Sequence, residues 1–142
     1  MSRYLGIDFG DARIGVAVSD EMNFMAHPLE TIFVKKTAPI PRIRTLAAEK
    51  SVSKIIVGMP RNMDGSHGPA AQKVHAFIDA LAAAITCEII PWDERMTTVS
   101  ATRALHEAGR NAKQQRNIID QAAAQIILQS WMDGQPDPFA VL

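Results

Sequence analysis

The chain has 142 residues, of which 47% are hydrophobic and 21% charged, so one domain of ordinary size with a real core is expected over residues 1–142. Fifteen basic residues balance fifteen acidic ones, which excludes a strongly cationic protein and leaves only a local basic patch to hold a polyanion. The single cysteine, Cys87, excludes an internal disulfide and a cysteine-based zinc site. No long uncharged apolar run predicts a membrane span, so we expect a cytoplasmic protein without a membrane partner.

The first predicted elements are three strands. Residues 4–9 form an apolar run that ends at Gly10, and residues 13–19 alternate well enough for a second strand. Because so few residues separate these two runs, they predict an antiparallel hairpin. Residues 28–35 predict the third strand.

Helices and strands alternate in the rest of the chain. The predicted elements are a helix over 41–50, a strand over 54–58, a helix over 69–86, a strand over 87–92, a helix from 97 or 98 to 108, and a helix over 116–133. This order predicts an α/β fold with a mixed five-stranded sheet, three antiparallel strands followed by parallel strands, flanked by helices. We expect the first strand to pair in parallel with the fourth, and the fourth with the fifth.

Three acids are candidates for a shared site. Asp8 interrupts an apolar strand, Glu94 follows the last strand, and Asp120 lies in the first turns of the last helix. Ligands collect beyond the carboxyl ends of parallel strands, where these acids can converge. Three carboxylates without clustered Cys or His suit Mg²⁺ or Mn²⁺, and two such ions about 4 Å apart can activate water for phosphodiester cleavage.

Each of these acids also has a structural interpretation on its own. Asp8 could form a salt bridge to Arg13 or Arg95. Glu94 could be solvated or cap the following helix, and Asp120 could be a structural acid. The convergence of all three at one sheet edge favours the metal-binding interpretation.

Basic and polar residues near the same edge are candidates for substrate binding. Arg61 and Asn62 lie in a glycine-containing loop that leads into a helix, a context suited to phosphate. Arg95, Lys113 and Arg116 could grip a nucleic-acid backbone. The alternatives are a plain strand-to-helix loop and a solvated connector between two helices.

Four motifs of the chain resemble one known family. They are LGIDFGDARIGVAVSD at 5–20, IIVGMPRNMDGSHGPAAQKV at 56–74, DERMTT at 93–98 and IIDQAAAQIILQSWMD at 118–133. In order and spacing they resemble the YqgF family of Holliday-junction-resolvase-like proteins, also described as pre-16S rRNA nucleases. The resemblance implies a ribonuclease-H-like fold and a nuclease that processes the 5′ end of precursor 16S rRNA in ribosome biogenesis.

The resemblance also implies site residues. The catalytic and metal-binding acids carry over to Asp8, Glu94 and Asp120. The residues that also fall within matching motifs are Arg13, Asn62, Asp64, Arg95 and Thr98. Of these, Arg13, Asn62 and Arg95 are expected substrate contacts. The expected partners are structured RNA such as precursor rRNA, or branched DNA, with ribosome association and a monomeric or weakly dimeric state. The better-known junction resolvases have an acid near the end of the fourth strand and a pair of acids on the last helix. Here the fourth strand leads into Met59, and Ala123 and Ala124 stand where a second helix acid is expected. Both differences disfavour junction cleavage.

Three other functions stay open at this point. They are a Holliday-junction-type DNA resolvase, a non-catalytic RNA- or ribosome-binding factor, and a nucleotide-binding module, since residues 6–18 also resemble the first phosphate loop of the actin-like ATPases. That last group usually needs two such domains, and this chain has the length of one.

Overall fold

The computed structural model describes residues 2–60, 68–94 and 112–136, and in the last range it describes the side chains from Ile119 onward. In chain order the elements are β1 (Arg3–Asp8), β2 (Arg13–Ser19), β3 (Ala26–Phe33), α1 (Pro39–Glu49), β4 (Val52–Met59), α2 (Pro69–Ala84), β5 (Glu88–Asp93) and α4 (Ala112–Asp133). The helix predicted from 97 or 98 to 108 lies outside the described residues.

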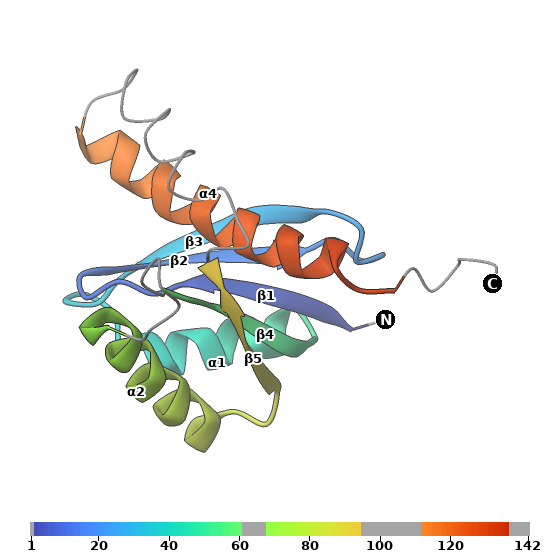
Figure 1. Cartoon of the computed structure of the whole chain (residues 1–142), viewed down its shortest axis with the longest axis horizontal. Coiled ribbons are helices and arrows are strands. Elements are labelled where there is room, and N and C mark those ends of the chain that lie inside the picture. Colours follow the sequence, from blue (N-terminus) through green and yellow to red (C-terminus); the bar gives the residue numbers. More distant parts are fainter. Residues whose placement is uncertain (1, 61–67, 95–111, 137–142) are drawn as a thin grey trace.

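The five strands form one sheet in the order β3-β2-β1-β4-β5. β1 pairs with β2 and β2 with β3 in antiparallel fashion, while β1–β4 and β4–β5 are parallel. The predicted mixed sheet and both predicted parallel pairings are therefore confirmed. Helix α4 lies across one face of the sheet, and α1 and α2 cover the other (Figure 1).

Most predicted boundaries move by one to four residues, and those of β3 and α1 move for identifiable local reasons. β3 begins at Ala26 rather than 28 because its first residues pair with the end of β2, and it stops at Phe33, whose carbonyl accepts the amides of Lys36 and Thr37 in a turn. Helix α1 starts at Pro39 rather than 41, since a proline in the first helical turn removes no intrahelical hydrogen bond.

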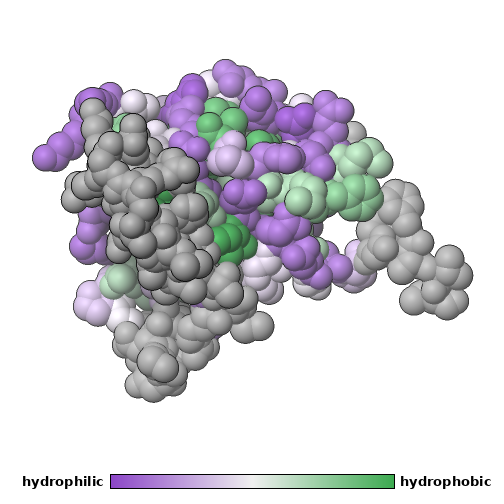
Figure 2. All heavy atoms as spheres, turned by 90° about the horizontal axis from the view of Figure 1, so that it is seen from above, coloured by the Kyte–Doolittle hydropathy of each residue, from purple (hydrophilic) through white to green (hydrophobic). Residues whose placement is uncertain are grey.

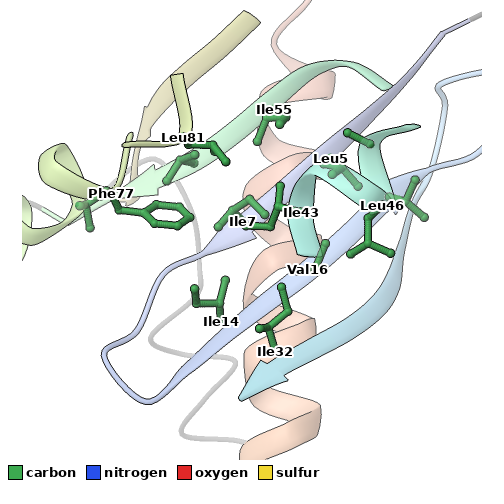
Figure 3. Close-up of a cluster of buried hydrophobic side chains, with 14 of the residues drawn as sticks. Leu5, Ile7, Ile14, Val16, Ile32, Ile43, Leu46, Ile55, Phe77 and Leu81 are labelled. Carbon is green, nitrogen blue, oxygen red and sulfur yellow. The ribbon is translucent and has the colours of Figure 1, made fainter. Parts of the chain in front are cut away.

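The larger core lies between the sheet and the α1–α2 layer. Alternate residues of β1, β2 and β4 point into it, as the two-residue period of a strand requires. They meet side chains at helical spacing on α1 and α2 (Figure 3). The fully buried members include Leu5, Ile7, Ile14, Val16, Ile32, Ile43, Ile55, Val57 and Leu81. Each large aliphatic side chain buried in this way contributes about 1.5–3 kcal/mol.

The opposite face of the sheet carries small residues and lets α4 approach closely. A Cβ at Gly6 would lie 2.6 Å from the Ala124 carbonyl oxygen, and Ala123 and Ala124 are buried in this contact. Farther along α4, the ring of Trp131 meets Tyr4 edge-on, with centroids 5.1 Å apart. None of α1, α2 and α4, as described, has the length and apolar character that a bilayer crossing requires.

Three glutamines at four-residue spacing attach α4 to the edge strand β3. Gln121 donates to the Thr31 hydroxyl, and Gln125 donates to the backbone carbonyl of Ala26. Gln129 accepts the backbone N–H of Ala26 at 2.8 Å. Residues four apart share one helix face, so this row fixes both the rotation and the axial position of α4 over the sheet.

Candidate active site

Asp8 ends β1 and is 6% exposed. It is the one charged residue classed as buried among residues 2–60, 68–94 and 119–136. Since residues alternate across a strand, Asp8 lies on the same face as Gly6, which is the face that α4 covers. A carboxylate in this place is costly unless it is paired or bound to a cation, as the sequence analysis anticipated.

On one side of Asp8 the neighbouring strand position is Gly15, and α4 lies directly on it. Gly15 is the residue opposite Asp8 in the β1–β2 ladder, so the two share a face. A Cβ at Gly15 would overlap the carbonyl oxygen of Asp120 and lie 3.1 Å from its Cα. The backbone of Asp120 therefore stands beside Asp8 only because Gly15 has no side chain.

On the other side the neighbouring position is Gly58. Val57 pairs with Ile7, so the next residues of β4 and β1, Gly58 and Asp8, are neighbours by continuation of that register. A Cβ at Gly58 would lie 2.8 Å from Oε1 of Glu94. The Glu94 carboxylate therefore lies over the strand position that neighbours Asp8, since adjacent strands are about 4.8 Å apart. The sheet thus brings all three predicted acids to one edge and one face.

Asp120 has a cationic partner in this structure. The Nε atom of Arg13 donates to its Oδ2 atom at 2.8 Å, and the two side chains are 28% and 14% exposed. A salt bridge between Arg13 and Asp8 was one sequence-based alternative; in the structure Arg13 pairs with Asp120 of α4. Residue Arg95, the other partner considered for Asp8, lies outside the described residues.

The donor set of the site suits a hard divalent cation. All three acids supply carboxylate oxygens, which Mg²⁺ and Mn²⁺ prefer. Among the side chains that the structure describes, no group of three or more His, Cys, Asp or Glu is arranged to hold a metal ion. In this structure the carboxylate of Asp120 is instead engaged with Arg13.

The other predicted substrate contacts are only partly described. Residues Arg61, Asn62 and Arg95 lie outside the described residues. Lys113 and Arg116 lie in the first turns of α4, whose beginning rises away from the sheet in the view of Figure 1. Their side chains are outside the described part.

Sequence reasoning missed three features of this edge. Gly15 and Gly58 were detectable in principle, since a glycine inside a strand often marks the close approach of another chain segment. The Arg13–Asp120 pair had no local signal. The third is an ion pair between Lys73 of α2 and Asp11 of the β1–β2 turn, 2.9 Å long. It borders a pocket of 180 Å³ lined by Phe9, Gly10, Asp11, Pro60, Pro69, Ala70, Lys73 and Val74.

Comparison with known proteins gives concordant results. A family model described as "RuvX: Holliday junction resolvase" matches residues 2–134. A relative from Pelotomaculum thermopropionicum with the name "Putative pre-16S rRNA nuclease" is 46% identical over 138 residues and is aligned over 96% of this chain and 90% of its own length. A relative of the same name from Acetivibrio thermocellus is 44% identical over 136 residues, 94% of this chain and 96% of its own.

Among solved structures, T. thermophilus RuvC in complex with a Holliday junction substrate matches with a TM-score of 0.55 at 16% identity. The match covers 93% of this chain and 94% of that one. A second T. thermophilus RuvC structure matches with a TM-score of 0.53. This likeness confirms the predicted ribonuclease-H-like fold.

Proposed function

Because the chain belongs to the RuvX family, described as Holliday junction resolvases, we propose that it is a nuclease that hydrolyses phosphodiester bonds in structured nucleic acid. Its substrate is precursor 16S rRNA, cut at the 5′ end in the cytoplasm, and residues 1–142 form one catalytic domain. The name shared by relatives that are 44–46% identical supports the RNA substrate. The structural observation that carries the proposal is the placement of Glu94 and Asp120 on either side of the buried Asp8.

We assign Asp8, Glu94 and Asp120 as catalytic acids that would hold Mg²⁺ or Mn²⁺. When bound, such a cation supplies an activated water and stabilises the leaving oxygen. The protein contributes by crowding carboxylates at one edge, where their mutual repulsion favours a divalent cation. Asp8 lies in a strand and Asp120 in a helix, which hold geometry better than loops do, and Glu94 directly follows β5.

Substrate binding is assigned to basic and polar residues around the same edge. Such side chains would contact phosphates and set the position of the nucleic acid without reading its sequence. The assigned residues are Arg13, Arg61, Asn62, Arg95, Lys113 and Arg116. This group supplies the local positive charge that the neutral chain as a whole lacks.

The proposal is tested by Asp8→Asn. This change removes one charge and keeps the shape, so cleavage of precursor 16S rRNA in Mg²⁺ or Mn²⁺ should fall about 100-fold or more. The fold should persist and be slightly more stable without a cation, because repulsion within the acid group is relieved. Gel analysis of labelled precursor RNA measures the rate, and urea unfolding measures the stability.

Asp79→Asn is the matched control, because Asp79 is an exposed acid on α2 and its loss should leave cleavage unchanged. Equal cleavage by wild type and Asp8→Asn would overturn the assignment and indicate a contaminating nuclease.

Branched DNA is the second candidate substrate, since the family description names Holliday junctions. Side-by-side reactions with precursor RNA and a four-way DNA junction decide between them. Preferential cutting of the junction would replace the rRNA assignment while leaving the roles of the acids intact.

A further inference from the structure

The Arg13–Asp120 ion pair joins two residues to which different functions are assigned. Arg13 is the first residue of β2, and Asp120 lies 107 positions later on α4. Their hydrogen bond, 2.8 Å from Nε to Oδ2, is charge-assisted and partly shielded from solvent, since the two side chains are 28% and 14% exposed.

The positions of Arg13 and Asp120 are fixed by backbone contacts and not only by their side chains. Arg13 is held in the sheet opposite Phe33 of β3. Gly15, two residues on and hence on the same face of β2, is the position on which the Asp120 backbone rests. Arg13 and Asp120 are therefore set beside each other by the same contact that sets Asp120 beside Asp8.

The two assigned roles compete as long as the pair is formed. A guanidinium that neutralises Asp120 lowers the attraction of that carboxylate for a second cation. While it is paired with Asp120, the guanidinium is also not available to bind a phosphate. The same carboxylate cannot serve a divalent cation and Arg13 equally well, because the two cations would repel each other within a few ångströms.

We propose that Arg13 is a built-in counter-cation of the acid group. It holds Asp120 until a divalent cation takes that carboxylate, and the freed guanidinium then binds a substrate phosphate. Arg13 is thus a positioning residue that couples cation binding to substrate binding. This inference rests on the proposed nuclease function and adds an order of events to it.

The decisive measurement is Mn²⁺ affinity without nucleic acid, by titration calorimetry on the full chain. Arg13→Gln removes the charge and retains a hydrogen-bond donor, so Mn²⁺ should bind about 5-fold more tightly than to wild type. A residue that only supported Asp120 would give the opposite result. Arg13→Lys keeps the charge and should stay near wild type.

Arg3→Gln is the matched control. Arg3 also forms an ion pair, at 3.1 Å with Glu21, but it lies at the start of β1, the opposite end of that strand from Asp8. Its Mn²⁺ affinity should equal that of wild type. Urea unfolding of each variant verifies that it is folded before titration.

A second arm measures the affinity for a structured RNA with Ca²⁺ replacing Mn²⁺, the RNA being recovered intact as a check. Arg13→Gln should bind this RNA about 3-fold or more weakly, because one phosphate contact is lost. Equal RNA affinity would overturn the released-guanidinium half of the proposal. Equal or weaker Mn²⁺ binding by Arg13→Gln would overturn the counter-cation half, and absence of Mn²⁺ binding to wild type would instead overturn the proposed function.

Discussion

Gly15 and Gly58 lie on either side of Asp8 in the sheet, and neither position has room for a side chain. At Gly15 the obstacle is the backbone of Asp120, which can move only if the whole of α4 moves. At Gly58 the near atoms are the tips of Ile127 and Glu94, which are flexible. The two glycines therefore differ in how strictly they are required.

Gly15→Ala should destabilise the protein by about 1–3 kcal/mol, because the new methyl group meets backbone and pushes α4 away from the sheet. The same displacement moves Asp120 away from Asp8 and should reduce RNA cleavage and Mn²⁺ affinity together. Urea unfolding measures the stability, gel analysis of labelled precursor RNA measures cleavage, and titration calorimetry measures the Mn²⁺ affinity.

Gly134→Ala provides the comparison for this glycine. A Cβ there meets only ordinary contacts, the nearest at 3.5 Å, so its stability should stay within about 0.5 kcal/mol of wild type. If Gly15→Ala and Gly134→Ala unfold at the same urea concentration, the packing of α4 on the sheet does not require a glycine at position 15.

Among the elements, α4 packs so closely on the sheet that the residues one turn after Asp120 must be small. Ala123 and Ala124 are 1% and 0% exposed, and the Ala124 carbonyl packs over Gly6. A carboxylate at either position would be buried against the sheet without a partner, which is costly. Because α4 approaches the sheet so closely, the acid that its described part brings near the site is Asp120, one turn before these alanines.

Helix α1 and strand β3 are joined by a two-pronged ion pair with a predictable pH dependence. Arg42 donates from Nε and Nη2 to the two carboxylate oxygens of Glu30, at 2.8 and 2.6 Å. These hydrogen bonds, and secondarily the positive charge of Arg42, hold the pKa of Glu30 below its usual value of 4.5, against the opposing effect of burial. A lowered pKa means that the pair stabilises the fold above about pH 4.5 and that this contribution fades as pH falls through the lowered pKa.

Glu30→Gln should therefore lower the free energy of unfolding at pH 7 by up to about 1 kcal/mol, a modest value because both side chains are about one-third exposed. The difference from wild type should shrink at pH 3.5. Urea unfolding at both pH values measures it.

Glu88→Gln is the control for this pair, since Glu88 meets Lys54 at 3.4 Å and is 62% exposed. It should match wild type at both pH values. A Glu30→Gln deficit that is unchanged at pH 3.5 would mean that packing, not charge, links α1 to β3.

At the scale of the whole molecule, the sequence predicted the layers better than the contacts between them. Strands and their parallel neighbours followed from apolar runs and from the order of elements, and they are confirmed. The convergence of Asp8, Glu94 and Asp120 at one edge followed from strand ends and from the family resemblance. The Arg13–Asp120 pair could not be predicted from the sequence. The two residues are 107 positions apart, and their contact depends on how α4 packs against the strand glycines, which no local pattern encodes.

The neutral overall charge predicts a moderate response of RNA binding to salt. Seen from the α4 side, the described surface is mainly hydrophilic with smaller apolar areas (Figure 2). Since acids and bases balance over the chain, binding should be dominated by about three or four of the five basic side chains assigned to the site. Raising salt from about 50 to 200 mM should then weaken RNA binding by the Asp8→Asn variant about 10- to 100-fold.

Fluorescence anisotropy at several salt concentrations measures this slope. A loss of 1,000-fold or more over the same range would indicate a much more extensive cationic surface than the one assigned here.

The glutamine row between α4 and β3 has a consequence for self-assembly. β3 is one of the two outer strands of the sheet, and an outer strand offers unpaired amides and carbonyls on which another chain can stack. At Ala26 both of these backbone groups are already taken, the N–H by Gln129 and the carbonyl by Gln125. The same side chains that orient the helix therefore cover the first residue of β3 and leave less of this edge open to stacking by another chain.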